Sequence, residues 1–409
     1  MRSKKLSISW RMIVAIFAAF LLMTGTWAMA AEKTLHNFDK GADGTNPYAG
    51  VIFDSAGNLY GTTFAGGQQG LGTVIELTPV TGGHFKEKVL YSFGLGKDGV
   101  GPSAGLIFDG AGNLYGTTVQ GGDYGLGTVF ELTPVSGGHW TEQVLHSFGH
   151  GKDGAGPTAG LVFDASGNLY GTTAQGGAYS LGTGFELKPK TGGGWTETVL
   201  HNFGHSKDGY DPGAGLIFDS TGNLYGTTFY GGAFGKGTVF ELSPKSGGGW
   251  TEKVVHSFGS GKDGANPLAE LVFDAAGDLY GTTYEGGAYA TGTVFELVPK
   301  TGGGWTEKGV HNFGSGKDGV QPRARLIFDS AGNLYGTTYL GGSYAKGTAF
   351  KLTPKTGGGW TEKVLHNFGN AKDGASPVAG VIFDASGNAY SATLGGGAFG
   401  FGTVFEITP

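Results

Sequence analysis

The 409-residue sequence contains no cysteine. An exported chain of this composition gains nothing from disulfide bonds and must depend on packing. Charged residues are also scarce, at 15%, and the formal net charge is −6. Without a basic excess the chain is a poor partner for nucleic acid or anionic lipid, so we expect neither. Hydrophobic residues still make up 39% and aromatic residues 13%, which favours a folded protein over a disordered one.

Helical periodicity is absent, and the 85 glycines do not follow the three-residue spacing of collagen. The sequence instead repeats every 55 residues, with no insertion or deletion. One Phe-Asp pair marks every copy, and it begins at Phe53, Phe108, Phe163, Phe218, Phe273, Phe328 and Phe383. A fixed period of this length is the signature of a repeat architecture, so the glycines are expected to serve turns.

Residues 1–30 resemble a cleaved signal peptide. Four basic residues accompany a short apolar run from Met12 to Met23, and Ala28-Met29-Ala30 fits the small-x-small cleavage rule. We therefore expect a mature chain that starts near Ala31 and is secreted or periplasmic, with a membrane anchor as the alternative. Removing this segment takes away four basic and no acidic residues, which changes the net charge from −6 to −10.

Each repeat reads as four short antiparallel strands. In residues 199–253, apolar or β-branched runs alternate with Gly, Pro and Asp turn signals, and Asp219 and Gly222 fit the first and fourth positions of a type I turn. A four-stranded meander repeated in this way predicts a propeller blade.

The two ends of the array indicate how it closes. Residues 34–38 match residues 364–368 of a later copy, whereas the last copy stops at Ile407, before its outer strand. A ring closed by an N-terminal strand explains both ends and hides the exposed strand edges. We therefore predict an all-β fold, a single seven-bladed β-propeller over residues 31–409.

The repeat unit also resembles a known family. Its Gly-Leu-Ile-Phe-Asp-x-x-Gly-Asn-Leu-Tyr-Gly-Thr-Thr and Gly-Thr-Val-Phe-Glu-Leu segments look like the GloVer tandem repeat, over about residues 34–409. The hairpin is more weakly similar to NHL-like propeller repeats. The GloVer resemblance implies an exported bacterial protein and supplies no activity.

Two catalytic patterns are accidental in the repeat register. Ser103 satisfies Gly-x-Ser-x-Gly, but other copies carry unrelated residues there and no helix follows. The Gly-x-Gly-x-x-Gly segments at Gly94, Gly149 and Gly259 each run into another strand, so we interpret them as loops. We expect no catalytic residue and no cofactor.

Three further positions recur around the array. Histidines occupy one position of the outer strand, where a metal cluster is disfavoured and packing beside Phe is expected. An aspartate at one linker position, Asp208 for example, predicts an Asx turn, with a charged rim or weak Ca²⁺ sites as alternatives. A tryptophan such as Trp250 opens the outer strand, and we expect packing rather than a ligand platform. No metal site is predicted.

The loop after the Thr-Thr pair holds the candidate binding residues. An aromatic residue recurs there in six copies, as Tyr124, Tyr179, Phe234, Tyr289, Tyr344 and Phe399. This loop should emerge at the same end of the blade as the linker that carries Lys207, Lys262 and Lys317. Aromatic rings beside polar groups suit the stacking and hydrogen bonding of sugars, and the alternative is that the rings pack between blades.

These observations favour a non-enzymatic binding or scaffold module, with carbohydrate or a cell-surface polymer as partner. The symmetry of the repeat favours binding over catalysis, because multivalent binding uses many equivalent blades whereas an active site needs unique residues. The alternatives are an extracellular lyase or hydrolase with a site at the central channel, and a purely structural surface protein. Only scattered loop residues break the symmetry, among them Glu285, Arg323 and Arg325. We expect a monomer.

Overall fold

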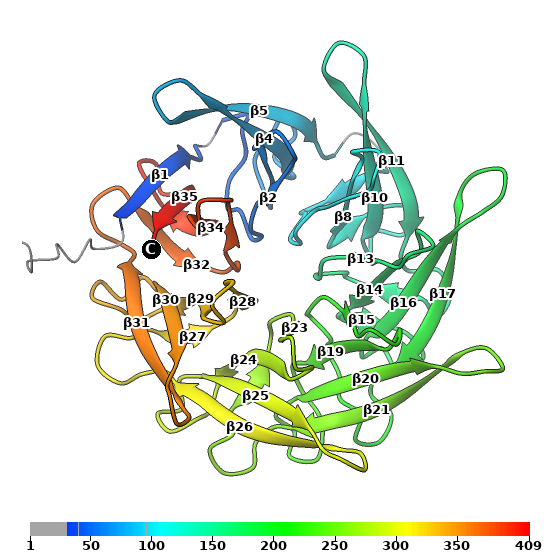
Figure 1. Cartoon of the computed structure of the whole chain (residues 1–409). Coiled ribbons are helices and arrows are strands. Elements are labelled where there is room, and N and C mark those ends of the chain that lie inside the picture. The colour runs from blue at the N-terminus through cyan, green and yellow to red at the C-terminus, as the bar shows by residue number, and fades with distance from the viewer. Residues whose placement is uncertain (1–30, 40, 95–96) are drawn as a thin grey trace, which may run out of the picture.

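The structure is a computed structural model that describes residues 31–39, 41–94 and 97–409. It confirms the all-β prediction: the described residues contain strands and turns and no helix. Seven blades surround a central axis (Figure 1). The signal-peptide prediction for residues 1–30 lies outside the described residues. In the described part of the chain no helix is long and apolar enough to cross a membrane.

Every blade contains four strands in the same order from the axis outward. The innermost strands are β2 (Ile52–Phe53), β7 (Ile107–Phe108), β13 (Val162–Phe163), β18 (Ile217–Phe218), β23 (Val272–Phe273), β28 (Ile327–Phe328) and β33 (Ile382–Phe383). The second strands are β3 (Leu59–Thr63), β8 (Leu114–Thr118), β14 (Leu169–Thr173), β19 (Leu224–Thr228), β24 (Leu279–Glu285), β29 (Leu334–Leu340) and β34 (Ala389–Gly396). The third strands are β4 (Thr73–Val80), β10 (Thr128–Val135), β16 (Thr183–Pro189), β20 (Thr238–Pro244), β25 (Thr293–Pro299), β30 (Thr348–Pro354) and β35 (Thr403–Thr408). The outer strands are β5 (His84–Ser92), β11 (His139–Ser147), β17 (Trp195–Asn202), β21 (Trp250–Ser257), β26 (Trp305–Asn312), β31 (Trp360–Asn367) and β1 (Ala31–Asn37).

Short strands tie the linkers between blades to the loops after the second strands. They are β6 (Gly99–Val100), which pairs with β9 (Gln120–Gly121), and β12 (Gly154–Ala155), which pairs with β15 (Gln175–Gly176). In the later blades β22 (Ala265–Pro267), β27 (Val320–Pro322) and β32 (Gly374–Pro377) pair with the extended second strands. The linkers are therefore part of the sheet edge and not free connections.

The hairpin between the first two strands has the predicted turn. Asp219 Oδ1 accepts hydrogen bonds from the backbone N–H groups of Thr221 and Asn223, at 2.8 and 2.9 Å. The N–H of Gly222 donates to the Asp219 carbonyl at 3.3 Å, and Gly222 has φ of +90°. Glycine accepts this backbone conformation without strain.

Replacing Gly222 with valine is expected to destabilise the fold. A Cβ at this position would meet no atom within 4 Å, so the cost is backbone strain alone. A β-branched residue at positive φ should lower the free energy of unfolding by about 1–3 kcal/mol. Chemical denaturation of Gly222→Val and Gly222→Asn measures it. Asparagine tolerates this region better, so equal losses in the two variants would contradict the strain argument.

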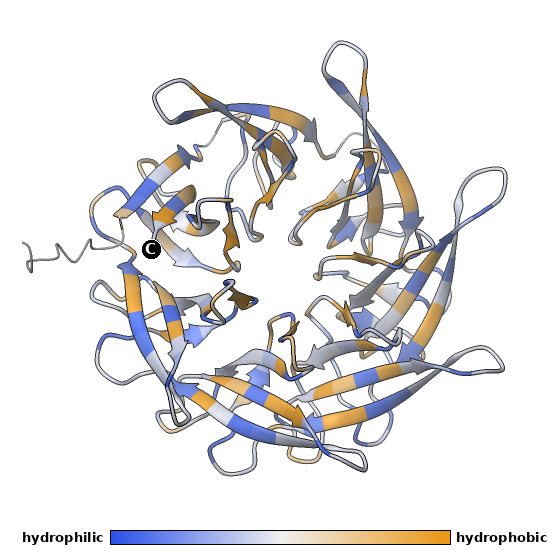
Figure 2. Ribbon diagram, in the orientation of Figure 1, coloured by the Kyte–Doolittle hydropathy of each residue, from blue (hydrophilic) through white to orange (hydrophobic). Residues whose placement is uncertain are grey.

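The hydrophobic core lies between adjacent blades. One cluster joins Tyr60 and Phe93 of the first blade to Leu114 and Phe130 of the second, and each of these side chains is buried. The outer strands alternate along their length, and the hydropathy colouring of Figure 2 follows this alternation. Each blade thus buries its apolar face only when a neighbour is present, which makes the ring one cooperative unit.

The N-terminal strand closes the ring as predicted. β1 pairs antiparallel with β35, from Ala31 opposite Thr408 to Asn37 opposite Thr403. Figure 1 shows these two strands, from opposite ends of the chain, side by side. Phe38 is 1% exposed and shares a core cluster with Val51 of the first blade. The seam between the last and first blades is therefore built like the others.

A β-bulge in every outer strand was not predicted. In the second blade the register shifts between Val129 and Phe130, so that Leu145 is an extra residue in β11. Leu145 is 8% exposed, and His146 follows it near the C-terminal end of the strand. Bulges re-aim side chains, and here the bulge turns a leucine into the core just before the repeated histidine.

Candidate functional site

The loops that carry the candidate residues lie on one face of the ring, as predicted. This upper face holds the loops after the second strands and the linkers between blades. The backbone N–H of Gly122 donates to the Asp98 carbonyl at 2.8 Å. Lys97 Nζ lies 2.7 Å from Asp123 Oδ1. A linker thus contacts the loop of the blade that it enters.

The six recurrent aromatic residues, which we call the rim aromatics, are all exposed. The exposed fractions are 51% for Tyr124, 47% for Tyr179, 55% for Phe234, 53% for Tyr289, 48% for Tyr344 and 59% for Phe399. The alternative that these rings pack as core between blades is therefore wrong.

The bases of four rim aromatics lie close to a linker glycine even though their rings are exposed. A Cβ built on Gly149 would come within 2.8 Å of the Tyr124 Cβ, and one on Gly259 within 3.1 Å of the Phe234 Cβ. Only glycine in the following linker allows this approach. The Tyr124 ring also lies 5.6 Å from the His150 ring. These contacts place the bases of the side chains, while the rings themselves stay exposed.

A groove of about 660 Å³ surrounds one rim aromatic, between the first and second blades. It is lined by Lys97, Tyr124, Glu142, His146 and His150 among others. An aromatic face, a cation and acidic side chains thus converge on one concave surface. This combination provides stacking together with hydrogen-bond donors and acceptors.

Lys207, Lys262 and Lys317 occupy the register position of Lys97 in later linkers. All three side chains are exposed, and among the described residues none of them forms an ion pair. Their place beside the rim loops follows from the same linker geometry. Their charges are therefore available to a ligand at the upper rim.

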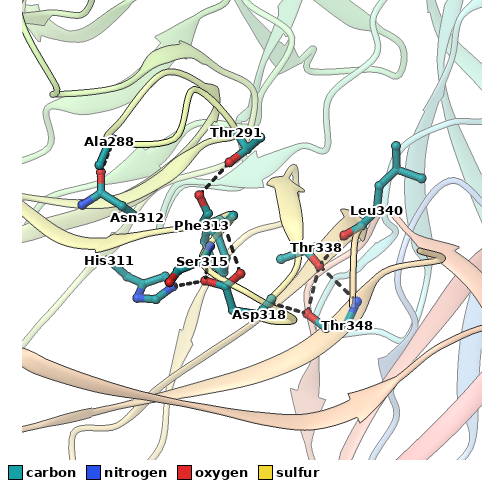
Figure 3. Close-up of polar contacts among 11 residues, drawn as sticks. Ala288, Thr291, His311, Asn312, Phe313, Ser315, Asp318, Thr338, Leu340 and Thr348 are labelled. Carbon is teal, nitrogen blue, oxygen red and sulfur yellow. Dashed lines mark hydrogen bonds and ion pairs between the residues drawn. The ribbon is translucent and has the colours of Figure 1, made fainter. Parts of the chain in front are cut away.

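The repeated histidine and the repeated linker aspartate form a pair. His311 Nε2 lies 3.3 Å from Asp318 Oδ2, and the Gly314 N–H donates to Asp318 Oδ1 at 3.0 Å (Figure 3). The same pairing joins His36 to Asp43, His146 to Asp153, His201 to Asp208, His256 to Asp263 and His366 to Asp373. The predicted Asx turn is wrong in its geometry, because this aspartate reaches back four residues to a glycine and seven to a histidine.

Packing explains the histidines and tryptophans, as predicted. The His146 ring lies edge-on to Phe148 with a centroid separation of 4.6 Å. The Trp140 ring lies 6.3 Å from Tyr60 of the preceding blade. Burial lowers the pKa of His146 in spite of the neighbouring Asp153. Among the described residues, no group of three or more His, Asp and Glu side chains is arranged to hold a metal ion.

A glutamate of the outer strand faces each linker across the seam. Burial, followed by the charge of Asp98, raises the pKa of Glu142 to about 7. The pKa is likewise raised to about 7 for Glu87, Glu197, Glu252, Glu307 and Glu362. One carboxylate oxygen of each is buried without a hydrogen-bond partner. Repetition at six seams marks these glutamates as part of the architecture rather than as a catalytic acid.

The mouth of the central channel carries residues that occur in one copy only. Arg323 lies between the rings of Tyr284 and Tyr339, with its guanidinium carbon 5.7 and 4.9 Å from their centroids. Arg325 Nη1 donates to Glu270 Oε1 at 3.0 Å, where the other five copies have glycine. Ser103 also lines this mouth, where its hydroxyl lies 3.5 Å from the Thr158 carbonyl oxygen. The sequence analysis used the variation at this register position only to reject Ser103 as a nucleophile, and did not predict that the differing residues line one cavity.

The fold and this upper face define a class: a closed seven-bladed β-propeller of 55-residue repeats, with repeated rim grooves and a distinct channel mouth. The chain belongs to the Gloeobacter/Verrucomicrobia repeat family, whose model matches residues 22–219 and 219–409. The predicted GloVer resemblance is thereby confirmed. No curated protein matches the chain by sequence.

Solved structures share the fold. An ancestral GH74 enzyme matches with a TM-score of 0.60 and 13% identity over 93% of this chain. The chain spans about half of that protein, since 51% of it is covered. At this identity the likeness concerns the fold alone.

Proposed function

We propose that this protein is an exported, non-enzymatic binding module that holds a polysaccharide or cell-surface polymer along its upper rim. The observation that carries the proposal is the ring of six exposed rim aromatics at one register position. Each blade then offers a weak, nearly equivalent subsite. Sites fixed on one rigid ring act at a high effective concentration, so together they retain a polymer far better than a single sugar.

The chemistry of the groove supports a sugar ligand. Tyr124 offers a ring face to a pyranose, and Lys97 and Glu142 offer a donor and acceptors for hydroxyl groups. The backbone that carries Tyr124 packs closely against Gly149, so only the side-chain torsions of the ring lose freedom on binding. In the described part of the ring, the glutamates with a raised pKa that face the linkers recur at six seams, which favours multivalent binding at the rim over catalysis there.

Changing Tyr289 and Tyr344 together to alanine is expected to weaken polymer retention by roughly 5–10-fold, because two linked subsites are lost. The melting temperature should stay near that of the parent, since both rings are exposed. Affinity electrophoresis of the mature protein in gels containing xylan, mannan, β-glucan, polygalacturonate or peptidoglycan fragments measures the retention. Release of reducing ends from any of these polymers would contradict the non-enzymatic role.

A matched control removes exposed apolar side chains from the opposite face. Val80 and Val135 are each 42% exposed and lie at the ends of β4 and β10. They stand beside the hairpins that join the third and outer strands, which we call the lower hairpins. The Val80→Ala, Val135→Ala variant should be retained like the parent. Loss of stability in the tyrosine variant, with unchanged retention per folded molecule, would overturn the proposal.

A further inference from the structure

The channel mouth differs from the rim because its residues do not repeat. At the position of Arg323 the other copies have Tyr48, Ser103, Thr158, Gly213, Leu268 and Val378. A cavity of about 700 Å³ opens here, and these residues line it together with Phe64 and Asp211. A cavity of this size accommodates a small molecule. Its one arginine is therefore its most specific feature.

Arg323 is held by aromatic contacts alone. Tyr284 and Tyr339 come from the extended second strands β24 and β29 of adjacent blades and cover the guanidinium group. Within the described ranges Arg323 has no hydrogen bond and no ion pair. Rings against a guanidinium face leave its N–H donors at the edges, in the plane where a carboxylate binds through two oxygens.

The surrounding charges select the kind of anion. Arg325 is neutralised by Glu270, so Arg323 is the one uncompensated cation of the mouth among the described residues. Asp211 lines the same cavity, and burial raises the pKa of its carboxyl group. A dianion such as phosphate would meet one positive charge and a protein of net charge −6. A monoanion matches the site better.

The rest of the cavity suits the body of a ring. Leu268, Val378 and Phe64 provide apolar walls, and Tyr48 lies 5.0 Å from Phe64 at its edge. Gly213 also lines the cavity and leaves space, since a Cβ there would lie 3.8 Å from Leu268 and Thr158. The ligand should thus combine one carboxylate with a compact ring.

We propose that the channel mouth is a second, single-copy site that binds a small ring-shaped carboxylate through the free edge of Arg323. The chemistry fits both a free ring acid and a uronic acid unit of a polysaccharide. The site is independent of polymer binding at the rim, because it shares no residue with the rim aromatics.

Calorimetry of the mature protein with galacturonate, glucuronate, benzoate, glucose and inorganic phosphate tests the proposal. We expect one site per chain for at least one of the carboxylates, and no binding of glucose at that site. Arg323→Leu, which copies Leu268 of the preceding blade, should weaken this binding at least tenfold. Tyr339→Leu, which copies Leu394 of the last blade, should weaken carboxylate binding by a smaller factor. This variant keeps the guanidinium group and removes only one of the two rings that contact it.

Two controls separate the site from general electrostatics and from the rim. Lys262→Leu removes the same charge from the rim and should leave carboxylate binding unchanged, as should Tyr289→Ala with Tyr344→Ala. Binding of uronates but not benzoate assigns the site to a sugar acid, and the reverse assigns it to an aromatic acid. The proposal is overturned if the parent binds no carboxylate, or if Arg323→Leu and Lys262→Leu weaken binding equally while the fold is intact.

Discussion

Deleting Glu32–Phe38 from the mature chain is expected to lower the free energy of unfolding by about 5 kcal/mol or more and to cause aggregation. Phe38 is 1% exposed, and loss of one such side chain alone costs about 3–5 kcal/mol. The deletion also removes the ladder partners of β35 between Thr403 and Ile407. An unpaired edge strand is a template for association with other chains. Thermal denaturation and size-exclusion chromatography measure the two effects.

A circular permutant provides the matched control. Ala31 lies opposite Thr408, so a short glycine turn could join them as the lower hairpins join the third and outer strands of other blades. A chain opened after Gly41 and joined in this way keeps every strand pair. It should melt near the parent, whereas the deletion should not. A deletion variant as stable as the parent would show that β1 does not close the ring.

The second large effect is a loss of stability as the pH rises. Burial raises the pKa of the six outer-strand glutamates to about 7 in the folded protein, above the ordinary value of 4.5 for a glutamate. The folded state therefore binds protons more tightly than the unfolded chain. The stability that these groups contribute is fully present below their unfolded pKa and is lost as the pH rises through about 7.

Neutral variants isolate this effect. Replacing Glu142, Glu197 and Glu252 together with glutamine should raise the melting temperature by several degrees at about pH 8 and change it little at about pH 4.5. Burial lowers the pKa of four histidines and gives the opposite slope, but that contribution is the same in parent and variant. Glu285→Gln, at the exposed end of β24, is the control. Parallel pH curves for parent and triple variant would refute the raised pKa values.

Much of the fold was predictable because its determinants are local and repeated. The Asp219 turn, the strand order and the closing strand all follow from a pattern read many times over. The bulge at Leu145 was not predictable, since an extra residue in one strand changes neither the period nor the apolar pattern. The pairing of Asp318 with His311 was missed for a similar reason, because both residues also fit simpler local roles.

The candidate site was predictable in part. The rim aromatics and the shared upper face followed from loop topology, but exposure of the rings depends on how linker glycines such as Gly149 approach them in space. The cluster of Arg323 with Tyr284 and Tyr339 needed the structure, since these residues lie far apart in the sequence and meet only across two blades. The repeat identifies positions that are the same in all copies, whereas the channel mouth is lined at the Arg323 position by residues that differ from copy to copy.

The central claim is that equivalent rim subsites on one rigid ring hold an extended polymer. Titration of the mature protein with an oligosaccharide series cut from the retained polymer tests it most directly. We predict weak binding of the monosaccharide and a steep gain in affinity once the chain is long enough to contact two neighbouring rim aromatics. Affinity that stays flat across the series, or absence of binding at every length, would contradict the claim.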